Sequence, residues 1–200
     1  MTPNPFEALP SSVEVGGRAV PIDPDFRVGV AIELEALSDA PDIEGLLRMF
    51  YPGGVPEPAS QAAEQMLAFY AGADAGEPRQ GSAKGGRAYD FSQDADALLA
   101  SFLDAYGIDL STARLHWWSF RRLMLNLPPE TPFMRRVYYR TADTKKMSRE
   151  ERKQVEKMRR QYALRRVAGP SPSPEELEKA LLDKVNRRFE EAQRLVGQKS

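Results

Sequence analysis

The chain has 200 residues and a formal net charge of −1; 42% of its residues are hydrophobic and 28% are charged. Such a chain has enough apolar side chains to fold around a sizeable core, and it is not a disordered polymer. The absence of cysteine excludes a disulfide framework, a thiolate zinc site and a cysteine nucleophile. His116 is the single histidine, so a histidine-rich metal site is excluded as well. The composition therefore argues against most familiar enzyme chemistries, and we expect no catalytic residues, no metal site and no cofactor.

The sequence also indicates where the protein works. No segment approaches the run of about 20 apolar residues that a membrane helix needs. The first residues lack the basic and then apolar layout of a secretory signal. We expect a soluble intracellular protein that makes no membrane contact.

The small net charge hides two oppositely charged parts. Residues 1–112 carry 6 basic and 18 acidic side chains, whereas residues 113–200 carry 22 basic and 11 acidic ones. Between Arg135 and Arg166 there are 13 basic residues and only 4 acidic ones. Such a block can bind phosphates or an acidic protein surface, but more often it is solvated or pairs with the acidic part of its own protein.

A β-hairpin is expected near the N-terminus. Two short strands, 13–15 and 19–22, flank Gly16-Gly17, a dipeptide that accepts positive φ at both central positions of a two-residue turn. In that register one face is apolar, made by Val13, Val15, Val20 and Ile22. Pro21 indicates an edge strand. Because a lone hairpin is marginal in water, we expect this one to lie on the helices that follow.

Three amphipathic segments follow, over residues 25–37, 42–51 and 62–71, and each is typical of a helix. The sequence Pro52-Gly53-Gly54 ends the second of them. Residues 72–87 have no apolar period and are rich in small and polar side chains, which predicts a surface loop.

The clearest helix is predicted between Ser92, as its N-cap, and Gly107, which ends it. Asp94 and Asp96 fall in its first turn, where carboxylates are favourable. Its expected inner face consists of Leu98, Leu99, Phe102, Leu103 and Tyr106. Hydrolase chemistry by paired carboxylates among Asp90, Asp94 and Asp96 is a remote alternative, since residues two apart on a helix do not face each other.

Ser111 is a candidate N-cap for a further helix that is apolar on two sides, which predicts a buried position. His116 lies between the two apolar stripes, and we interpret it as a hydrogen-bonded imidazole at the edge of the core. Trp117 and Trp118 are interpreted as anchors of the core or of an interface.

The basic block begins after Pro128-Pro129 with a short helical or extended segment, 133–139, which leads into a polar loop, 140–144. A long charged helix then starts at Ser148, which can form a capping box with Glu151. A narrow apolar stripe on this helix can seat it on its own core or bind a partner helix. The stripe supplies candidate partner-binding residues Val155, Met158 and Tyr162.

The C-terminal part is predicted to be a linker, 167–174, followed by an amphipathic helix, 175–200. The apolar face of this helix can pack outside the main domain or against another chain, a second copy included. It supplies the candidate partner-binding residues Leu177, Leu181, Val185 and Phe189. The main domain is then residues 1–166.

The predicted fold is mostly α, with an N-terminal β-hairpin packed on a bundle of about six to eight helices. A long basic helix and a hinged C-terminal amphipathic helix complete it.

The basic block is also a candidate nucleic-acid interface, because basic side chains with interleaved tyrosines suit a stacked single strand. The candidate anion-binding residues are Arg135, Arg136, Arg140, Lys145 and Lys146, and the tyrosines are Tyr138, Tyr139 and Tyr162. The affinity of such a site falls steeply as salt rises. Against it stands the acidic half of the chain, which can neutralise the block.

Three segments, in this order, resemble a known protein family. They are residues 9–17, then 106–110 continuing into Leu115-His116-Trp117-Trp118-Ser119-Phe120-Arg121, and then 139–144. The chain resembles the bacteriophage Gp15 family of long-tailed phages and related prophages, over roughly residues 6–164. The motifs are structural in character, and no functional residue is carried over from the family.

The resemblance implies a phage protein without an established enzymatic activity, encoded in the tail-gene cluster near the tape-measure gene. Tail assembly chaperones are usually encoded there. The resemblance therefore implies a tail morphogenesis factor in the host bacterial cytoplasm, with the tape-measure or tail-tube protein as partner. We expect its binding to survive moderate salt, because apolar burial contributes much of it.

Overall fold

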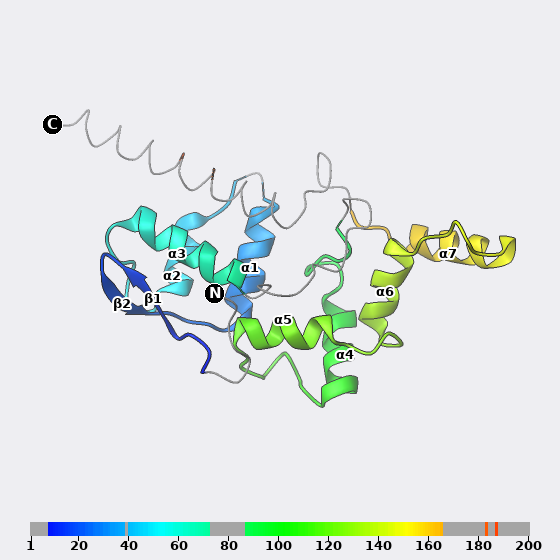
Figure 1. The fold of residues 1–200 in the computed structure, drawn as a ribbon, viewed down its shortest axis with the longest axis horizontal. Helices are drawn as coiled ribbons and strands as arrows, with labels where there is room; N and C mark the ends of the chain where they lie inside the picture. The colour runs from blue at the N-terminus through cyan, green and yellow to red at the C-terminus, as the bar shows by residue number, and fades with distance from the viewer. Residues whose placement is uncertain (1–7, 39, 73–86, 166–182, 184–186, 188–200) are drawn as a thin grey trace. The chain divides into compact units, whose positions relative to one another are not determined.

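The computed structural model describes residues 8–38, 40–72 and 87–165, together with Asp183 and Arg187. Figure 1 shows the elements of these residues in chain order: β1 (Ser12–Val15), β2 (Arg18–Pro21), α1 (Phe26–Ala36), α2 (Ile43–Phe50), α3 (Ala59–Gly72), α4 (Ala95–Tyr106), α5 (Trp117–Leu125), α6 (Pro132–Thr141) and α7 (Arg149–Gln161). The mostly α fold with an N-terminal hairpin is confirmed. The predicted linker 167–174, and the predicted helix 175–200 apart from Asp183 and Arg187, lie outside the described residues.

The chain divides into two compact units, which are described one at a time. Unit 1 consists of residues 1–77, 115–122 and 174–200, and unit 2 of residues 78–114 and 123–173. In the described part, unit 1 holds the hairpin, α1, α2, α3 and most of α5. Unit 2 holds the last turn of α5 together with α4, α6 and α7.

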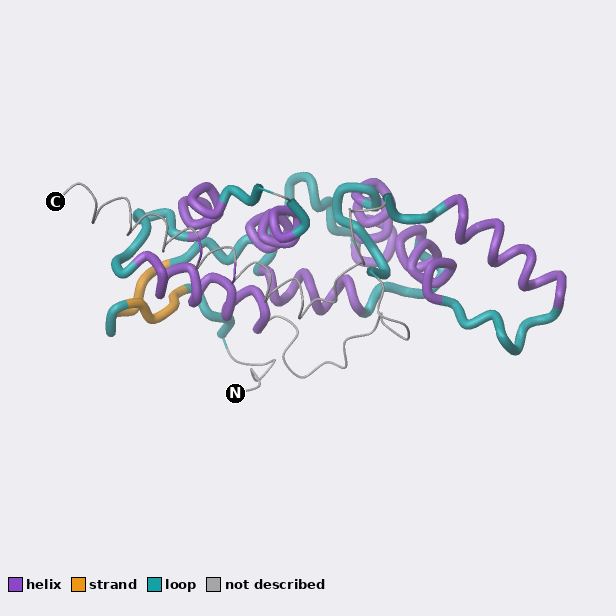
Figure 2. Tube along the Cα trace, turned by 90° about the horizontal axis from the view of Figure 1, so that it is seen from above, coloured by secondary structure: helices purple, strands orange, loops and turns teal. Residues whose placement is uncertain are grey.

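The hairpin of unit 1 forms as the sequence predicts. Gly16 and Gly17 have φ of 59° and 73°, the left-handed region that a two-residue turn between twisted strands requires. Val15 and Ile22 are buried on the apolar face. The hairpin lies against α3 (Figure 2), because the Gly16 N–H donates to Oε1 of Gln61 over 2.7 Å.

The first two helices of unit 1 each begin at an aspartate that caps them. The Asp25 carboxylate accepts from the Arg27 N–H over 3.0 Å at the start of α1. The Asp42 carboxylate accepts from the Gly45 N–H over 2.8 Å at the start of α2. Each carboxylate satisfies a backbone donor that has no partner within its helix.

The core of unit 1 is aromatic. The rings of Phe26 and Phe120 stack with centroids 4.7 Å apart, and Phe50 is fully buried. The Tyr51 hydroxyl donates to the Ala62 carbonyl over 2.8 Å, and burial raises the pKa of Tyr51 to about 12. The hydroxyl therefore stays protonated and bonded at any ordinary pH.

In unit 2, α6 contacts both α4 and α7. The predicted end of α4 is confirmed, since Gly107 follows it with φ of 66°. Two expectations for α4 are wrong. Its N-cap is Asp94 rather than Ser92. Leu99 and Leu103 were expected on the inner face but are 36% and 57% exposed. The buried face of α4 includes Leu98 and Phe102 but not these two leucines.

The start of α5 and the end of α6 also differ from the prediction. Ser111 caps no helix; its N–H and hydroxyl both donate to the Asp109 carboxylate, and α5 begins only at Trp117. The predicted segment 133–139 is helical, and α6 continues through Arg140 and Thr141, which were expected in a loop. The helical hydrogen bonds continue past Arg140, because the Ala142 N–H still donates to the Tyr138 carbonyl over 2.8 Å.

Candidate functional site

Two regions concentrate the residues that the sequence singled out: the segment 115–118 in unit 1, and the α6–α7 pair in unit 2. The first runs antiparallel to residues 24–26. The Phe26 N–H donates to the Leu115 carbonyl over 2.9 Å, and the Trp117 N–H donates to the Pro24 carbonyl over 2.7 Å. This pairing places the start of α5 beside the start of α1.

His116 uses both ring nitrogens inside unit 1. Nε2 lies 3.0 Å from the Pro10 carbonyl oxygen, and Nδ1 accepts from the Trp118 N–H over 3.1 Å. Since a carbonyl only accepts and an N–H only donates, the proton is on Nε2 and the ring is neutral. Burial holds the pKa of His116 below its ordinary value, and the charge of Arg122 acts in the same direction. The interpretation as a hydrogen-bonded core-edge imidazole is confirmed.

The two tryptophans cap the C-terminal end of α3. The Trp117 indole N–H donates to the Tyr70 carbonyl over 3.0 Å, and that of Trp118 donates to the Phe69 carbonyl over 2.9 Å. The last carbonyls of a helix have no partner within it, so the indoles satisfy them. A Cβ added at Gly29 on α1 would lie 2.3 Å from the Trp117 ring, so only glycine fits there. The Leu-His-Trp-Trp segment therefore joins α1, α3 and α5.

The centre of unit 2 is a buried ion cluster around Asp94. Its carboxylate, 1% exposed, accepts from Arg140 Nη1 and Nη2 over 2.6 and 2.8 Å and from Arg136 Nη1 over 3.1 Å. It also accepts from the Asp90 N–H over 3.0 Å. Burial by itself would raise the pKa of Asp94, but the hydrogen bonds and charge of the arginines outweigh it and hold the pKa below its ordinary value. Asp94 is thus a structural anion.

Arg140 connects this cluster to neighbouring segments. Its Nε donates to the Tyr162 carbonyl over 2.6 Å, and its Nη1 donates to the Ala88 carbonyl over 3.1 Å. The side chain is 6% exposed. One guanidinium therefore holds the end of α7, the segment before α4 and the buried carboxylate in place.

Sequence reasoning missed this role of Asp94, which it assigned only to the first turn of a helix. The one available signal was the spacing of Arg136 and Arg140, one helical turn apart, which puts two guanidinium groups on the same face of α6. Nothing in the sequence shows which carboxylate that face meets.

The described candidate partner-binding residues lie on the inner side of α7, which contacts α6. Val155 is 6% exposed, and Met158 and Tyr162 are half-buried. The Tyr162 ring stacks on Tyr139 with centroids 6.0 Å apart. Of the two alternatives for this stripe, the structure shows packing on the core of unit 2. The other candidates, Leu177, Leu181, Val185 and Phe189, lie outside the described residues.

The structure does not bring the candidate anion-binding residues together. Arg136 and Arg140 point inward, and their guanidinium groups already bind Asp94. Arg135, Lys145 and Lys146 are exposed. The physical reason is the helical course of α6, which turns Arg136 and Arg140 to one side and Arg135 to another. Anion binding at the three exposed residues stays a prediction.

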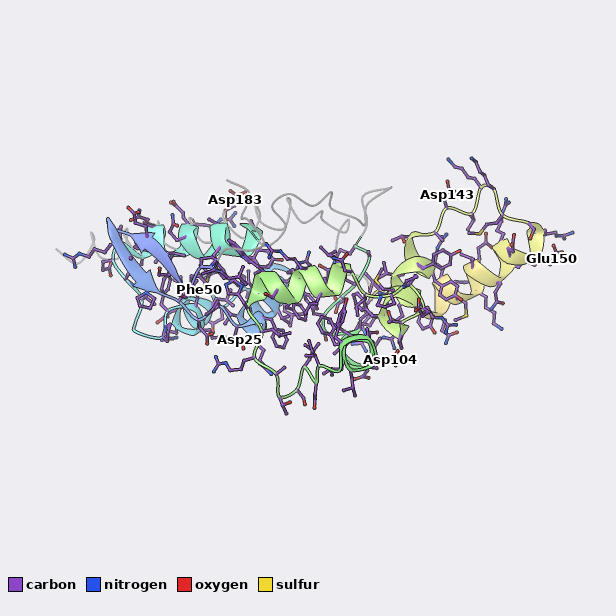
Figure 3. All side chains as sticks on the ribbon, turned by 60° about the horizontal axis from the view of Figure 1, so that its bottom comes forward. Asp25, Phe50, Asp104, Asp143, Glu150 and Asp183 are labelled. Atoms are coloured by element: carbon purple, nitrogen blue, oxygen red, sulfur yellow. The ribbon has the colours of Figure 1, made fainter. Side chains whose placement is uncertain are left out.

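The outer face of α7 carries a second set of basic side chains, which we call the α7 outer row: Arg149, Lys153, Lys157 and Arg160. All four are exposed. Figure 3 shows the side chains that project from this helix around the labelled Glu150. Among the residues that the structure describes, no carboxylate lies within 4.0 Å of these four cations. The basic block thus has a neutralised inner part and an unpaired outer part.

Within residues 8–38, 40–72 and 87–165, no three His, Asp or Glu side chains are grouped so that they could hold a metal ion. None of the described helices is long and apolar enough to cross a membrane.

Comparison with known proteins gives one match. The family model described as Bacteriophage Gp15 protein matches residues 6–164. No curated protein and no solved structure matches the chain.

Proposed function

The chain belongs to the bacteriophage Gp15 family, and from this premise we propose that it is a tail assembly chaperone that binds the tape-measure protein, the tail-tube protein or both. The observation that carries the proposal is the family match over residues 6–164. It supports a chaperone because the family is encoded in tail-gene clusters, where such chaperones are usually found. The proposed place of action is the cytoplasm of the host bacterium.

We propose a binding protein rather than an enzyme. Support comes from the groups best suited to proton transfer, His116 and Asp94. Both nitrogens of His116 are hydrogen-bonded within unit 1, and Asp94 is held by two arginines within unit 2. A group whose hydrogen bonds are all used by the fold has none left for a substrate.

The proposed contact surface is an exposed part of unit 2. The stripe of Val155 and Met158 faces the core, so it is not offered to a partner. The α7 outer row and the apolar pair Leu99 and Leu103 on α4 are exposed in the described part of unit 2, and we propose that a partner contacts them. Basic and apolar side chains are a combination that suits helices with an acidic and an apolar face.

The experiment is co-expression of the tagged full chain with the tape-measure and tail-tube proteins of its own gene cluster, followed by co-purification at low and at high salt. We expect a complex with at least one of them. The variant Leu103→Asp should weaken that complex, and Arg18→Glu, an exposed substitution in unit 1, is the control. Failure of both proteins to co-purify under either condition would contradict the proposal.

Nucleic-acid binding is a second candidate, favoured by the unpaired cations of the α7 outer row. The stacking residues that it needs are less available than the sequence suggests. Tyr139 and Tyr162 stack on each other, and Arg136 lies over the Tyr162 ring at 5.6 Å. Of the three tyrosines, Tyr138 alone is exposed, at 49%. Nucleic acid that co-purifies at low salt and is lost at high salt would favour this candidate.

A further inference from the structure

We propose that the α7 outer row is a docking site for an acidic segment of a partner protein, one that presents carboxylates at a spacing of one helical turn. The inference deepens the proposed function, on which it rests for the assumption that the ligand is a protein. It makes the binding polar and sensitive to salt.

The four cations form one stripe. Arg149, Lys153 and Lys157 are four residues apart, and Arg160 follows three residues later. With about 3.6 residues per turn and about 1.5 Å of rise per residue, they fall on one face of the helix over a length of about 16 Å. The opposite face is seated on α6 through Val155. The row therefore points away from α6.

The charge of the row is not used by the fold. On the inner side of α7, the Arg159 guanidinium donates to the Tyr139 and Ala142 carbonyls. On the outer side the single bond in the described structure is from Arg160 Nε to the Glu156 carbonyl oxygen, over 3.3 Å. Glu150 and Glu156 lie three or four positions from Lys153 and Arg160, but no ion pair joins them to the row among the described residues. Carboxylates from a partner would therefore meet cations that have no ion-pair partner there.

The row is held in a fixed geometry. Ser148 and Glu151 form a complete capping box at the start of α7. At the other end, the Tyr162 carbonyl accepts from Arg140, which is itself held by buried Asp94. A helix that is fixed at both ends loses little freedom on binding, so its charges contribute more to affinity.

A protein fits this surface better than a nucleic acid. Glu150 and Glu156 are exposed on the same helix and would repel any anion that lies directly over them. A protein segment can carry a lysine or arginine opposite these two positions and carboxylates opposite the row, whereas every unit of a phosphate backbone is negative. Tyr139 and Tyr162 are packed together and offer no face for a base. A partner would therefore recognise this surface by the positions of its four cations, which the helix fixes.

The test uses the full chain and a synthetic helical peptide with glutamates at positions i, i+4, i+8 and i+11, compared with the same peptide carrying glutamines. Binding is measured by fluorescence anisotropy at about 50 mM and about 500 mM salt. We expect the glutamate peptide to bind at low salt and to be released at high salt. The double variant K153Q/K157Q should weaken binding about three- to tenfold, as the loss of two exposed ion pairs implies.

The matched control is Arg18→Glu, which changes the net charge by the same amount on an exposed strand of unit 1. It should leave peptide affinity unchanged. The inference is overturned if both peptides bind equally, if K153Q/K157Q binds like the unaltered protein, or if a DNA oligonucleotide binds while the peptide does not. Self-association that K153Q/K157Q abolishes would also overturn it, because the occupant would then be a second copy.

The co-purification experiment separates this inference from the proposed function. A complex with a tail protein that K153Q/K157Q leaves intact contradicts the docking site and keeps the chaperone. Peptide binding through the row without any complex with the tail proteins contradicts the chaperone and keeps the docking site.

Discussion

Replacing Asp94 by asparagine should strongly destabilise unit 2. The substitution keeps the size of the side chain and removes the charge that two guanidinium groups face. Arg140, with a 6% exposed side chain, would be left as a buried cation without a counter-ion. Because Arg140 also holds the Tyr162 carbonyl, the end of α7 should loosen with it.

The size of the expected change in the free energy of unfolding follows from the burial of the Asp94–Arg140 ion pair. Removing one partner of a buried ion pair costs about 3–5 kcal/mol. We expect a value near the lower limit, about 3 kcal/mol, since asparagine retains an acceptor oxygen and Arg136 is 26% exposed and can be solvated. The exposed Asp104, on the same helix, is the control, and Asp104→Asn should change the free energy of unfolding by less than about 0.5 kcal/mol.

The assay is urea unfolding followed by circular dichroism, together with amide hydrogen exchange of α6 and α7. Acid adds a second readout. The pKa of Asp94 is lower in the folded protein than its ordinary value of 3.8, so the unfolded chain binds the proton more readily. The stabilisation is therefore present above that value and lost as the pH falls through the folded-state pKa. The D94N variant should lack this acid-dependent loss.

The reasoning is refuted if D94N has the urea midpoint and the acid profile of the unaltered protein. A double-mutant cycle with Arg140→Gln gives an independent check. The two substitutions remove the same interaction, so their combined effect should be smaller than the sum of the single effects by at least about 1 kcal/mol.

Three further substitutions probe other parts of the fold. Gly29→Ala should destabilise unit 1 by about 1–3 kcal/mol, because the new Cβ would lie 2.3 Å from the Trp117 ring, whereas Gly53→Ala, with no atom within 4 Å, should be neutral; thermal melting compares them. The pKa of His116 is lowered, so its contribution to stability is present above about 6.5 and lost as the pH falls, and a His116→Gln variant should show a flatter melting temperature between about pH 7.5 and pH 5. Ser148→Ala should cost about 1 kcal/mol by removing the capping box, with faster hydrogen exchange at the start of α7; unchanged exchange would contradict the role assigned to that cap.

Local features of this protein could be predicted from its sequence. The hairpin turn at Gly16-Gly17, the end of α4 at Gly107 and the capping box of α7 all depend on residues within a few positions of one another. Their energetics are settled by backbone conformation and by hydrogen bonds inside one turn. The sequence and the structure therefore agree on them.

The candidate site was only partly predictable, because it depends on contacts between residues that are far apart in the sequence. The sequence identified a basic block and an apolar stripe on one helix, but it could not choose between a stripe that binds a partner and one that packs on its own core. It also assigned Arg136, Arg140, Lys145 and Lys146 to one function. The structure separates them, because two face a buried carboxylate and two face water.

What the sequence by itself determined is the mostly α order of the elements, some of their local starts and stops, and the separation of charge along the chain. Tertiary structure alone decided that Asp94 neutralises Arg140, 46 positions away, and that the indole of Trp118 satisfies the end of α3, 49 positions away. The physical reason is that a buried charge or carbonyl needs a partner of suitable geometry, and packing selects that partner among residues that no sequence spacing brings together.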